Sequence, residues 1–339
     1  MIRVTALTAS KVDPSSRFRI RQFIKPLHEL GVDVSERRPL LNRYKIEPLP
    51  WLANALRLPG LVASRFSDVT WLGRELVSGR VTFEGFAGKK RVFDVDDAIW
   101  LPYQQAGQPD FSAEIARRCD GVIAGNRFLQ EHYEQAGARV WLVPTSVDTE
   151  QWKPRVNRTS RPWTIGWIGS WSNLKFLYDI EAPLAQFLSE HPEAQLLIVS
   201  DRQPVFKQLG DHQWRFAEWS AENEISMVQQ MDVGLMPLPD SEEARGKCGF
   251  KMLTYMSVGL PVIVSPVGVN KEILGYDEVG FGASAANDWY AALGRLFGET
   301  DLGPRLGIQG RKVVTEHYSV KANAPKLAAI FHEVVAGAR

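Results

Sequence analysis

Two basic residues and two glycines stand together before a predicted helix, where residues 245–249 read RGKCG. Glycine lets a backbone approach a ligand closely, and the first N–H groups of a helix have no partner inside it. The helix dipole and the charges of Arg245, Lys247 and Lys251 would attract an anion to this loop. The pattern therefore predicts a phosphate-binding site over residues 245–251.

The elements on either side of this loop should place it at the edge of a sheet. Residues 232–236 and 260–265 are short apolar runs closed by prolines, as expected of buried strands. Residues 250–257 carry apolar side chains at helical spacing, and Gly259 ends that helix as a C-terminal cap. Open α/β sheets bind nucleotides in such a loop, between a strand's carboxyl end and the next helix.

Strand and helix patterns alternate along the chain in two series. Further strands are predicted at 3–7, 32–35, 69–72, 91–95, 122–124, 140–143, 164–168, 196–200, 214–217 and 279–281. Helices are predicted at 17–30, 127–135 with Asn126 as its cap, 174–190, 221–230, 287–299, 302–317 and 320–335. The polar, proline-containing segment 149–162 predicts a linker. We expect an α/β protein with domains at 1–150 and 151–318 and a C-terminal helix at 319–339 that packs back toward the first domain.

Composition and short sequence patterns narrow the kinds of partner and compartment that we expect. The 40 basic and 39 acidic residues leave a net charge of +1, which gives no argument for nucleic acid. Cys119 and Cys248 are far apart, so reduced thiols are expected. There is no dinucleotide GxGxxG, no signal-peptide pattern and no apolar run near the ~20 residues of a spanning helix. We expect a cytoplasmic protein, with residues 17–30 and 42–65 as the segments that would contact the inner face of a membrane peripherally.

The block over residues 249–273, GFKxLxYMxxGxPVIxSxxGxNxEI, resembles the nucleotide-sugar site of family-4 (group 1) retaining glycosyltransferases. Residues 166–170, 122–126 and 143–148 resemble further segments of that family, and the likeness covers most of residues 1–320. The resemblance implies the GT-B fold, with two Rossmann-like doubly wound domains facing across a cleft. The N-terminal domain would bind an acceptor and the C-terminal domain a nucleotide sugar.

The same resemblance implies a metal-independent transfer, with no cofactor beyond the nucleotide-sugar co-substrate. The donor would be a UDP- or GDP-sugar, and the acceptor a saccharide or a lipid-linked molecule, in glycan, polysaccharide or glycolipid synthesis. Fixed positive groups would then stabilise the charge that gathers on the leaving diphosphate. Candidate donor- or nucleotide-binding residues are Gly169, Ser170, Lys175, Trp219, Arg245, Lys247, Cys248, Gly249, Lys251 and Thr254.

This chain departs from the family at three positions. Ser170 stands where the family has an arginine, and we suppose that Arg245 and Lys247 take over phosphate charge. The family also has two glutamates eight positions apart, and this chain has Gly246 and Thr254 in their places. Thr254 could hydrogen-bond a ribose hydroxyl, but the departure leaves the donor sugar open.

The predicted strand at 91–95 contains Asp94 and runs into Asp96 and Asp97, and alternation puts Asp94 and Asp96 on one side. Three interpretations stay open: a Mn²⁺ or Mg²⁺ site, a strand-end cap, and carboxylates that contact the sugar or the acceptor. By the resemblance, Asp96 and Asp97 stand at a His-Asp pair and are the catalytic candidates, with no metal expected. Candidate contacts to acceptor or phosphate are Arg17, Arg19 and Asn126, although a solvated basic face is the alternative for the arginines.

Two other functions fit the same pattern. A GT-B-like nucleotide-sugar epimerase needs the same diphosphate site and no acceptor. A catalytically silent nucleotide-binding scaffold is kept open by the missing glutamates. Donor turnover separates the three, because a transferase releases free nucleotide, an epimerase returns an epimerised donor, and a scaffold does neither.

Overall fold

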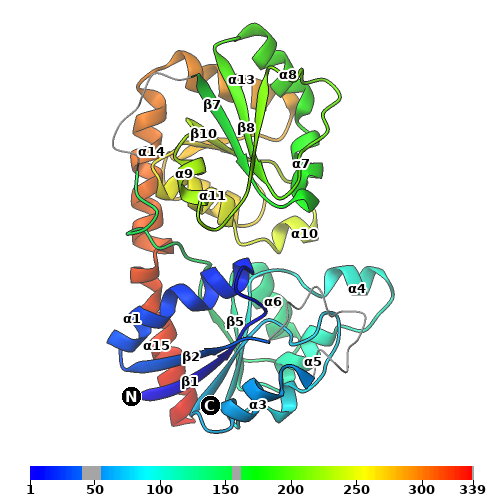
Figure 1. Ribbon diagram of the computed structural model, residues 1–339, viewed down its shortest axis with the longest axis vertical. Helices are drawn as coiled ribbons and strands as arrows, with labels where there is room; N and C mark the ends of the chain where they lie inside the picture. Colours follow the sequence, from blue (N-terminus) through cyan, green and yellow to red (C-terminus); the bar gives the residue numbers. More distant parts are fainter. Residues whose placement is uncertain (40–54, 155–161, 338–339) are drawn as a thin grey trace. The chain divides into compact units, whose positions relative to one another are not determined.

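The chain forms two compact units (Figure 1). The computed structural model describes residues 1–39, 55–154 and 162–337. Unit 1 comprises Met1–Ser146, Arg245–Cys248 and Val320–Arg339, and unit 2 comprises Val147–Ala244 and Gly249–Ser319. Parts of the predicted linker at 149–162 and of the basic region at 42–65 lie outside the described residues.

Unit 1 is built on a parallel sheet. Its strands, among the residues described, are β1 (Ile2–Leu7), β2 (Val32–Arg37), β3 (Val69–Gly73), β4 (Arg91–Val95), β5 (Gly121–Ala124) and β6 (Val140–Leu142). They run in the order β2-β1-β3-β4-β5-β6, and each neighbouring pair is parallel. The winding reverses between β1 and β3, which is a doubly wound arrangement.

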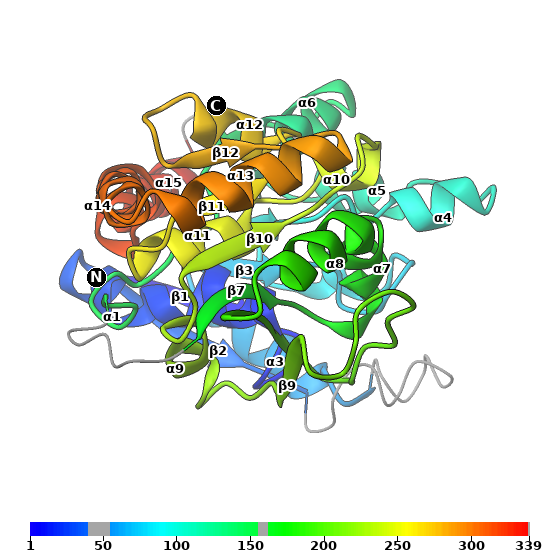
Figure 2. The same ribbon diagram turned by 90° about the horizontal axis from the view of Figure 1, so that it is seen from above.

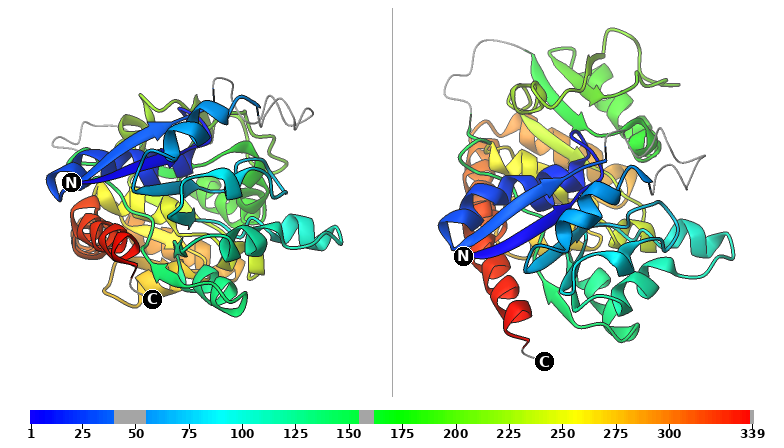
Figure 3. Two further views of the ribbon diagram at one scale, coloured as in Figure 1. Left: turned by 90° about the horizontal axis from the view of Figure 1, so that it is seen from below. Right: turned by 60° about the horizontal axis from the view of Figure 1, so that its bottom comes forward.

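Helices cover both faces of this sheet, because a parallel sheet must bury both. Trp71 and Val92 face a core shared with α1 (Ile24–Glu29) and α15 (Val320–Ala336). Their neighbours Leu72 and Phe93 face the opposite core. Helices α1 and α15 pack side by side, as Figures 1 and 3 show. The C-terminal helix thus completes one face of the N-terminal sheet.

Unit 2 contains a second parallel sheet. Its described strands are β7 (Trp163–Ile168), β8 (Ala194–Ser200), β9 (Trp214–Glu218), β10 (Val233–Met236), β11 (Val262–Val264) and β12 (Gly280–Gly282). They run in the order β12-β11-β10-β7-β8-β9, and each neighbouring pair is parallel. This is the strand order of dinucleotide-binding folds, with its winding reversal between β7 and β10. The two sheets confirm the predicted α/β class.

The two faces of the second sheet are also covered. Helices α8 (Glu181–Glu190) and α13 (Ala286–Gly298) pack against each other over one face, together with Val233 and Leu235 (Figure 2). On the other face, α11 (Phe250–Ser257) lies against β10, where an added Cβ on Gly234 would meet the Tyr255 ring at 2.2 Å. That contact explains the glycine in the strand, since any side chain there would displace the helix.

Two predicted helices are divided in the structure, and a proline near each break favours the division, although α15 continues through Pro325. Residues 17–30 form a π-helical turn (Ser16–Ile20), a 3₁₀ turn (Arg21–Phe23) and α1, while residues 174–190 form α7 (Leu174–Tyr178) and α8. Pro26 and Pro183 each fall at the third position of the helix that follows the break. Proline is tolerated in a first turn, but in the middle of a longer helix it would remove a hydrogen bond and clash.

The other helices of the described residues are α3 (Leu58–Ser64), α4 (Leu101–Gln105), α5 (Phe111–Arg117), α6 (Arg127–Gln135), α9 (Glu224–Val228), α10 (Glu242–Arg245), α12 (Val269–Leu274) and α14 (Leu302–Val313). Further short turns are η4 (Glu84–Phe86), η5 (Trp171–Asn173) and η6 (Val314–Tyr318). Within the described ranges, every helix is too short or too polar to cross a bilayer. Cys119 and Cys248 are free thiols.

Candidate active site

The carboxyl ends of β7 and β10 form the point in unit 2 where the winding reverses. Open α/β sheets bind their ligands at such a point. Gly169 directly follows β7, and Lys251 in the first turn of α11 extends to it. A Cβ added to Gly169 would lie 2.7 Å from Nζ of Lys251, so the glycine leaves room for an ammonium group at the strand end.

Lys251 is held in this place by an aromatic ring. Its Nζ lies 4.5 Å from the centroid of Trp167, whose ring is completely buried in the last part of β7. A cation over an aromatic face is stabilised by the ring quadrupole, more so where water is partly removed. Gly249, which precedes α11, has φ +67°, a conformation that favours glycine. A fixed cation and the positive end of α11 therefore lie together at the reversal point.

Ser170 and Lys175 follow β7 but are more exposed. Asn173 Nδ2 donates a hydrogen bond of 2.8 Å to Ser170 Oγ. Lys175 has a side chain that is 59% exposed, and its Nζ lies 3.5 Å from Oε2 of Glu243. Solvent and this carboxylate weaken the field of Lys175, so Lys251 is the better-placed of the two lysines for a diphosphate.

Trp219 lies next to the carboxyl end of β8, and Thr254 is buried. The Trp219 amide donates to the Ser200 carbonyl at the end of β8, and its indole Nε1 lies 3.2 Å from Glu224 Oε2. Thr254 is only 1% exposed, and its hydroxyl donates to the Lys251 carbonyl at 2.7 Å. Thr254 therefore sits in the packing of α11, and a ribose contact would have to reach it there.

The predicted phosphate loop is divided between the two units. Gly249 and Lys251 belong to unit 2, whereas Arg245–Cys248 packs within unit 1. Asn126 holds this segment, because its Nδ2 lies 3.3, 3.0 and 3.2 Å from the carbonyl oxygens of Arg245, Gly246 and Lys247. Its Oδ1 accepts from Leu129 N at 2.9 Å, which confirms the predicted cap of α6. Both ends of the Asn126 amide are thus engaged, so it positions the loop rather than presenting a contact to an acceptor.

Close packing leaves no room at Gly246 for the glutamate that the resembled family has at this position. A Cβ added to Gly246 would lie 2.5 Å from the Cβ of Ala98, so any larger residue at this position would clash. Cys248 is buried, and an added Cβ on Gly125 would lie 2.5 Å from its sulfur. Burial raises the pKa of the Cys248 thiol, which stays protonated at neutral pH. Only the backbone of Cys248 is suited to contact a donor.

Asp94 and Arg19 form a buried ion pair in unit 1. Arg19 Nε lies 2.7 Å from Asp94 Oδ1, and Trp71 Nε1 donates to Oδ2 at 3.0 Å. Arg19 Nη1 also donates to the Val143 carbonyl at 2.7 Å. The prediction of a solvated basic face is wrong for Arg19, which is buried. Two of its guanidinium nitrogens are used inside the fold, and Nη2 is buried without a hydrogen-bond partner. Both carboxylate oxygens of Asp94 are bound by Arg19 and Trp71, so this side chain stabilises the fold.

Asp96 stands in a different environment. The Ser15 hydroxyl donates to the Asp96 carboxylate, with oxygen distances of 2.8 and 2.7 Å. Burial raises the pKa of Asp96, while the nearby charges of Arg74 and Arg19 and the Ser15 hydrogen bond lower it. Arg74 directly follows β3 with φ +66°, which is unusual for a residue other than glycine and costly to hold. A partly exposed carboxylate that accepts from a hydroxyl, with the charges of Arg74 and Arg19 nearby, can accept a further hydrogen bond from a substrate hydroxyl.

Sequence reasoning missed Ser15 and Arg74. Both lie just beyond strands of unit 1, Ser15 in the loop after β1 and Arg74 at the end of β3. Polar residues that follow parallel strands were the signal that could have found them. Among the predicted residues, Asp97 Oδ1 accepts from the Ala98 amide at 3.0 Å, and the Arg17 guanidinium lies 4.7 Å from the Phe18 ring.

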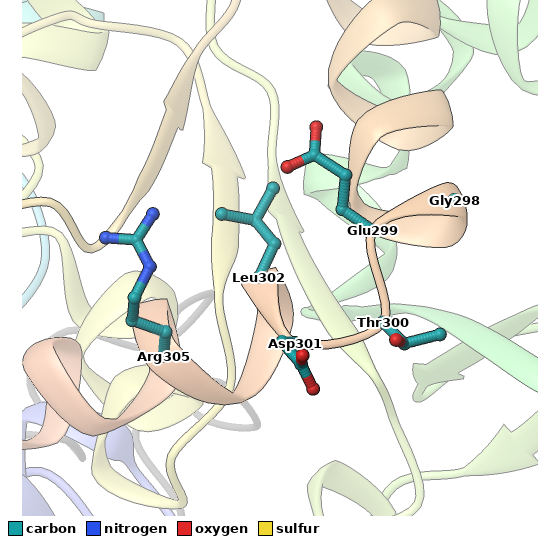
Figure 4. Close-up of a pocket in the computed structure, with 6 residues that line it drawn as sticks. All are labelled: Gly298, Glu299, Thr300, Asp301, Leu302 and Arg305. Atoms are coloured by element: carbon teal, nitrogen blue, oxygen red, sulfur yellow. The ribbon is translucent and has the colours of Figure 1, made fainter.

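The described residues contain no group of three His, Cys, Asp or Glu side chains that could hold a metal ion. A shallow pocket in unit 2 is lined by Gly298, Glu299, Thr300, Asp301, Leu302 and Arg305. Figure 4 shows Glu299, Leu302 and Arg305 directed to one side and Asp301 directed away from them. Arg305 is engaged with Glu278 at 2.6 Å, and no predicted site residue lines this pocket.

Residues 162–299 match the family model described as glycosyl transferases group 1. No curated protein matches the chain significantly. Among solved structures, sucrose-phosphate synthase from Thermosynechococcus elongatus is similar with a TM-score of 0.74 at 15% identity, over 100% of both chains. HepE of Anabaena in complex with UDP and glucose is similar with a TM-score of 0.74 at 13% identity, over 98% of this chain and 100% of that chain. WaaG, a glycosyltransferase involved in lipopolysaccharide biosynthesis, has a TM-score of 0.67 at 12% identity, over 97% of this chain and 99% of that chain.

These comparisons bear on two predictions. The likeness to solved structures extends over the whole chain and confirms the GT-B fold. The match at residues 162–299 confirms the relationship to group 1 glycosyltransferases in the part of the chain that contains β7, β10 and α11.

Proposed function

We propose that this chain, a group 1 glycosyltransferase by the match at residues 162–299, transfers a sugar from a UDP-sugar to a saccharide or lipid-linked hydroxyl acceptor. The observation that carries the proposal is that the Lys251 ammonium lies against Gly169, where the strand winding reverses in a sheet with the strand order of dinucleotide-binding folds. UDP is favoured as the nucleotide because the Anabaena neighbour was solved with UDP and with UDP-glucose.

Charge on the leaving diphosphate is the main physical problem of this reaction. Lys251 and the amino end of α11 supply fixed positive charge at the end of β7, and that charge gains most when the sugar–phosphate bond breaks. Arg245 and Lys247 are proposed to add to it. The reaction then needs no metal ion, because protein cations do the work that Mn²⁺ does elsewhere, and we propose retention at the anomeric carbon.

Asp96 is proposed to accept a hydrogen bond from the acceptor hydroxyl and to take up its proton as the new bond forms. The Ser15 hydroxyl holds both carboxylate oxygens and so orients the group. A pKa raised by burial makes Asp96 a better proton acceptor than an exposed aspartate. Asp97, which caps the Ala98 amide, is proposed to keep the neighbouring turn in place.

Thermal melts with UDP, GDP and ADP test the donor site first. A nucleotide that binds the folded protein raises its melting temperature, so UDP should stabilise the chain more than GDP or ADP. Slow release of UDP from UDP-sugars, with the anomeric configuration of the freed sugar followed by NMR, then tests catalysis and retention. No stabilisation by any of the three nucleotides would refute the donor site, and epimerised donor without free UDP would refute the transferase.

A further inference from the structure

One buried amide group of unit 2 is hydrogen-bonded at only one end. Asn270, in the first turn of α12, is 1% exposed, and its Nδ2 donates to the Ser265 carbonyl at 3.2 Å. Because a carbonyl oxygen can only accept, the nitrogen end of the amide faces Ser265 and the oxygen end points away from it. Asn270 Oδ1 is buried and has no hydrogen-bond partner within the described residues. A buried acceptor without a donor costs free energy.

The other buried asparagines of the described chain are Asn126 and Asn323, and both use the two ends of their amides. Asn323 Nδ2 donates to Ser146 Oγ at 3.1 Å, and its Oδ1 accepts from Lys326 Nζ at 2.9 Å. Buried polar groups are paired in this way as a rule. The oxygen of Asn270 is therefore an exception that requires an explanation.

The Asn270 oxygen lines a gap at the amino end of α11. Gly249 precedes this helix, and a Cβ added to it would lie 3.0 Å from Val269 Cγ1 and 3.5 Å from Asn270 Oδ1. The missing side chain thus leaves a space about the size of a methyl group, and a hydroxyl oxygen is smaller than a methyl group. Lys251 stands two residues further along, in the first turn of α11. The gap is therefore next to the cation that is proposed to hold the diphosphate.

The group that satisfies this oxygen must be a hydrogen-bond donor. Phosphate oxygens are acceptors, so the diphosphate itself cannot pair with Asn270 Oδ1, and the hydroxyl groups of the ribose and of the transferred sugar remain. In dinucleotide-binding folds the ribose is bound beyond the second strand, which is β8 in unit 2. Asn270 follows β11, on the other side of the β7–β10 reversal point from β8. The transferred sugar is thus the group on the side of Asn270.

We propose that a hydroxyl group of the transferred sugar enters the gap beside Gly249 and donates a hydrogen bond to Asn270 Oδ1. The inference rests on the proposed function, because it starts from the diphosphate at Lys251. It makes Asn270 a residue that selects the donor sugar. A sugar without this hydroxyl leaves the buried oxygen unpaired, and sites that hydrogen-bond a substrate hydroxyl reject analogues that lack it.

Calorimetry on the full chain tests the proposal with UDP, UDP-glucose and the UDP-deoxyglucoses that each lack one sugar hydroxyl. UDP-glucose is the parent donor because the Anabaena neighbour was solved with it. We expect UDP-glucose to bind more tightly than UDP, and one deoxy analogue to bind about tenfold more weakly than UDP-glucose. In Asn270→Ala, that analogue and UDP-glucose should bind equally, and the affinity for UDP should stay within about twofold of the wild type.

The matched control is Asn323→Ala, which removes a buried asparagine of unit 1 whose amide is paired at both ends. It should lower the melting temperature and leave the difference between UDP-glucose and the deoxy analogue unchanged. Melting curves check that Asn270→Ala is folded, and the comparison of analogues on the wild type needs no variant.

Equal affinity of the wild type for UDP-glucose and every deoxy analogue would overturn the proposal and leave a water molecule as the partner of Asn270 Oδ1. Equal loss of UDP and UDP-glucose affinity in Asn270→Ala would also overturn it, because the ribose would then be the partner. UDP binding without these sugar effects refutes this inference alone. A chain that binds neither UDP nor UDP-glucose refutes the proposed donor site and this inference with it.

Discussion

Replacement of Asp96 by asparagine should separate catalysis from stability. Asp96→Asn keeps the shape of the side chain and removes its ability to take a proton. Loss of a positioned general base typically lowers turnover by about 10²–10⁴-fold. UDP affinity should change little, because Asp96 belongs to unit 1 and the Lys251 site to unit 2. The free energy of unfolding should stay level or rise.

Two opposing contributions set that change in stability. One Ser15 proton is shared between carboxylate oxygens at 2.8 and 2.7 Å, and the amide oxygen of asparagine can still accept it. A neutral acceptor in place of a charged one costs about 0.5–1.5 kcal/mol. Against this, burial raises the pKa of Asp96 in the folded state, so the charged form opposes folding. The protonated Asp96 carboxyl contributes to the free energy of unfolding at low pH, and this contribution is lost as pH rises through the folded-state pKa. Asparagine does not ionise, so the variant does not lose it.

Asp94→Asn is the matched control, two positions away in the same segment. Burial raises the pKa of Asp94 as well, but this carboxylate is paired with a buried cation. Asp94→Asn should therefore destabilise the protein by about 3–5 kcal/mol, because the Arg19 guanidinium loses its counter-charge. The assays are denaturant melts from acid to neutral pH, calorimetric UDP binding and UDP release from a UDP-sugar. Wild-type turnover in Asp96→Asn, UDP affinity falling in step with turnover, or a loss of stability like that of Asp94→Asn would refute the reasoning.

Three further outcomes are expected. Lys251→Met should weaken the free energy of UDP binding by about 1–3 kcal/mol in calorimetry. Lys175→Met, which removes an exposed charge, should weaken it by less than about 1 kcal/mol. Equal losses would contradict the placement of the diphosphate on Lys251. Gly246→Glu should lower stability by about 1–3 kcal/mol through overpacking against Ala98, and a variant with unchanged melts would show that the loop has room for the glutamate. Sugar transfer should persist in EDTA, and activity that EDTA abolishes and Mn²⁺ restores would refute the metal-independent mechanism.

Features that depend on neighbouring residues could be predicted from the sequence. The Asn126 cap of α6 and the glycine that follows α11, Gly259 with φ +76°, are local signals, and the structure confirms both. The strands were found because buried parallel strands are continuous apolar runs. The order of the strands in the two sheets could not be predicted from the sequence, because it depends on which strands pair after long crossover connections. The breaks before Pro26 and Pro183 were readable in principle, because proline cannot continue a helix without cost.

The roles of the aspartates were decided by tertiary structure alone. Asp94 and Asp96 look equivalent in the sequence, yet Arg19 neutralises the first and Ser15 holds the second. Those partners lie 75 and 81 residues away along the chain. Spacing along a strand shows which side of the sheet a carboxylate faces, but its charge state and hydrogen bonds depend on residues that only the folded chain brings to it.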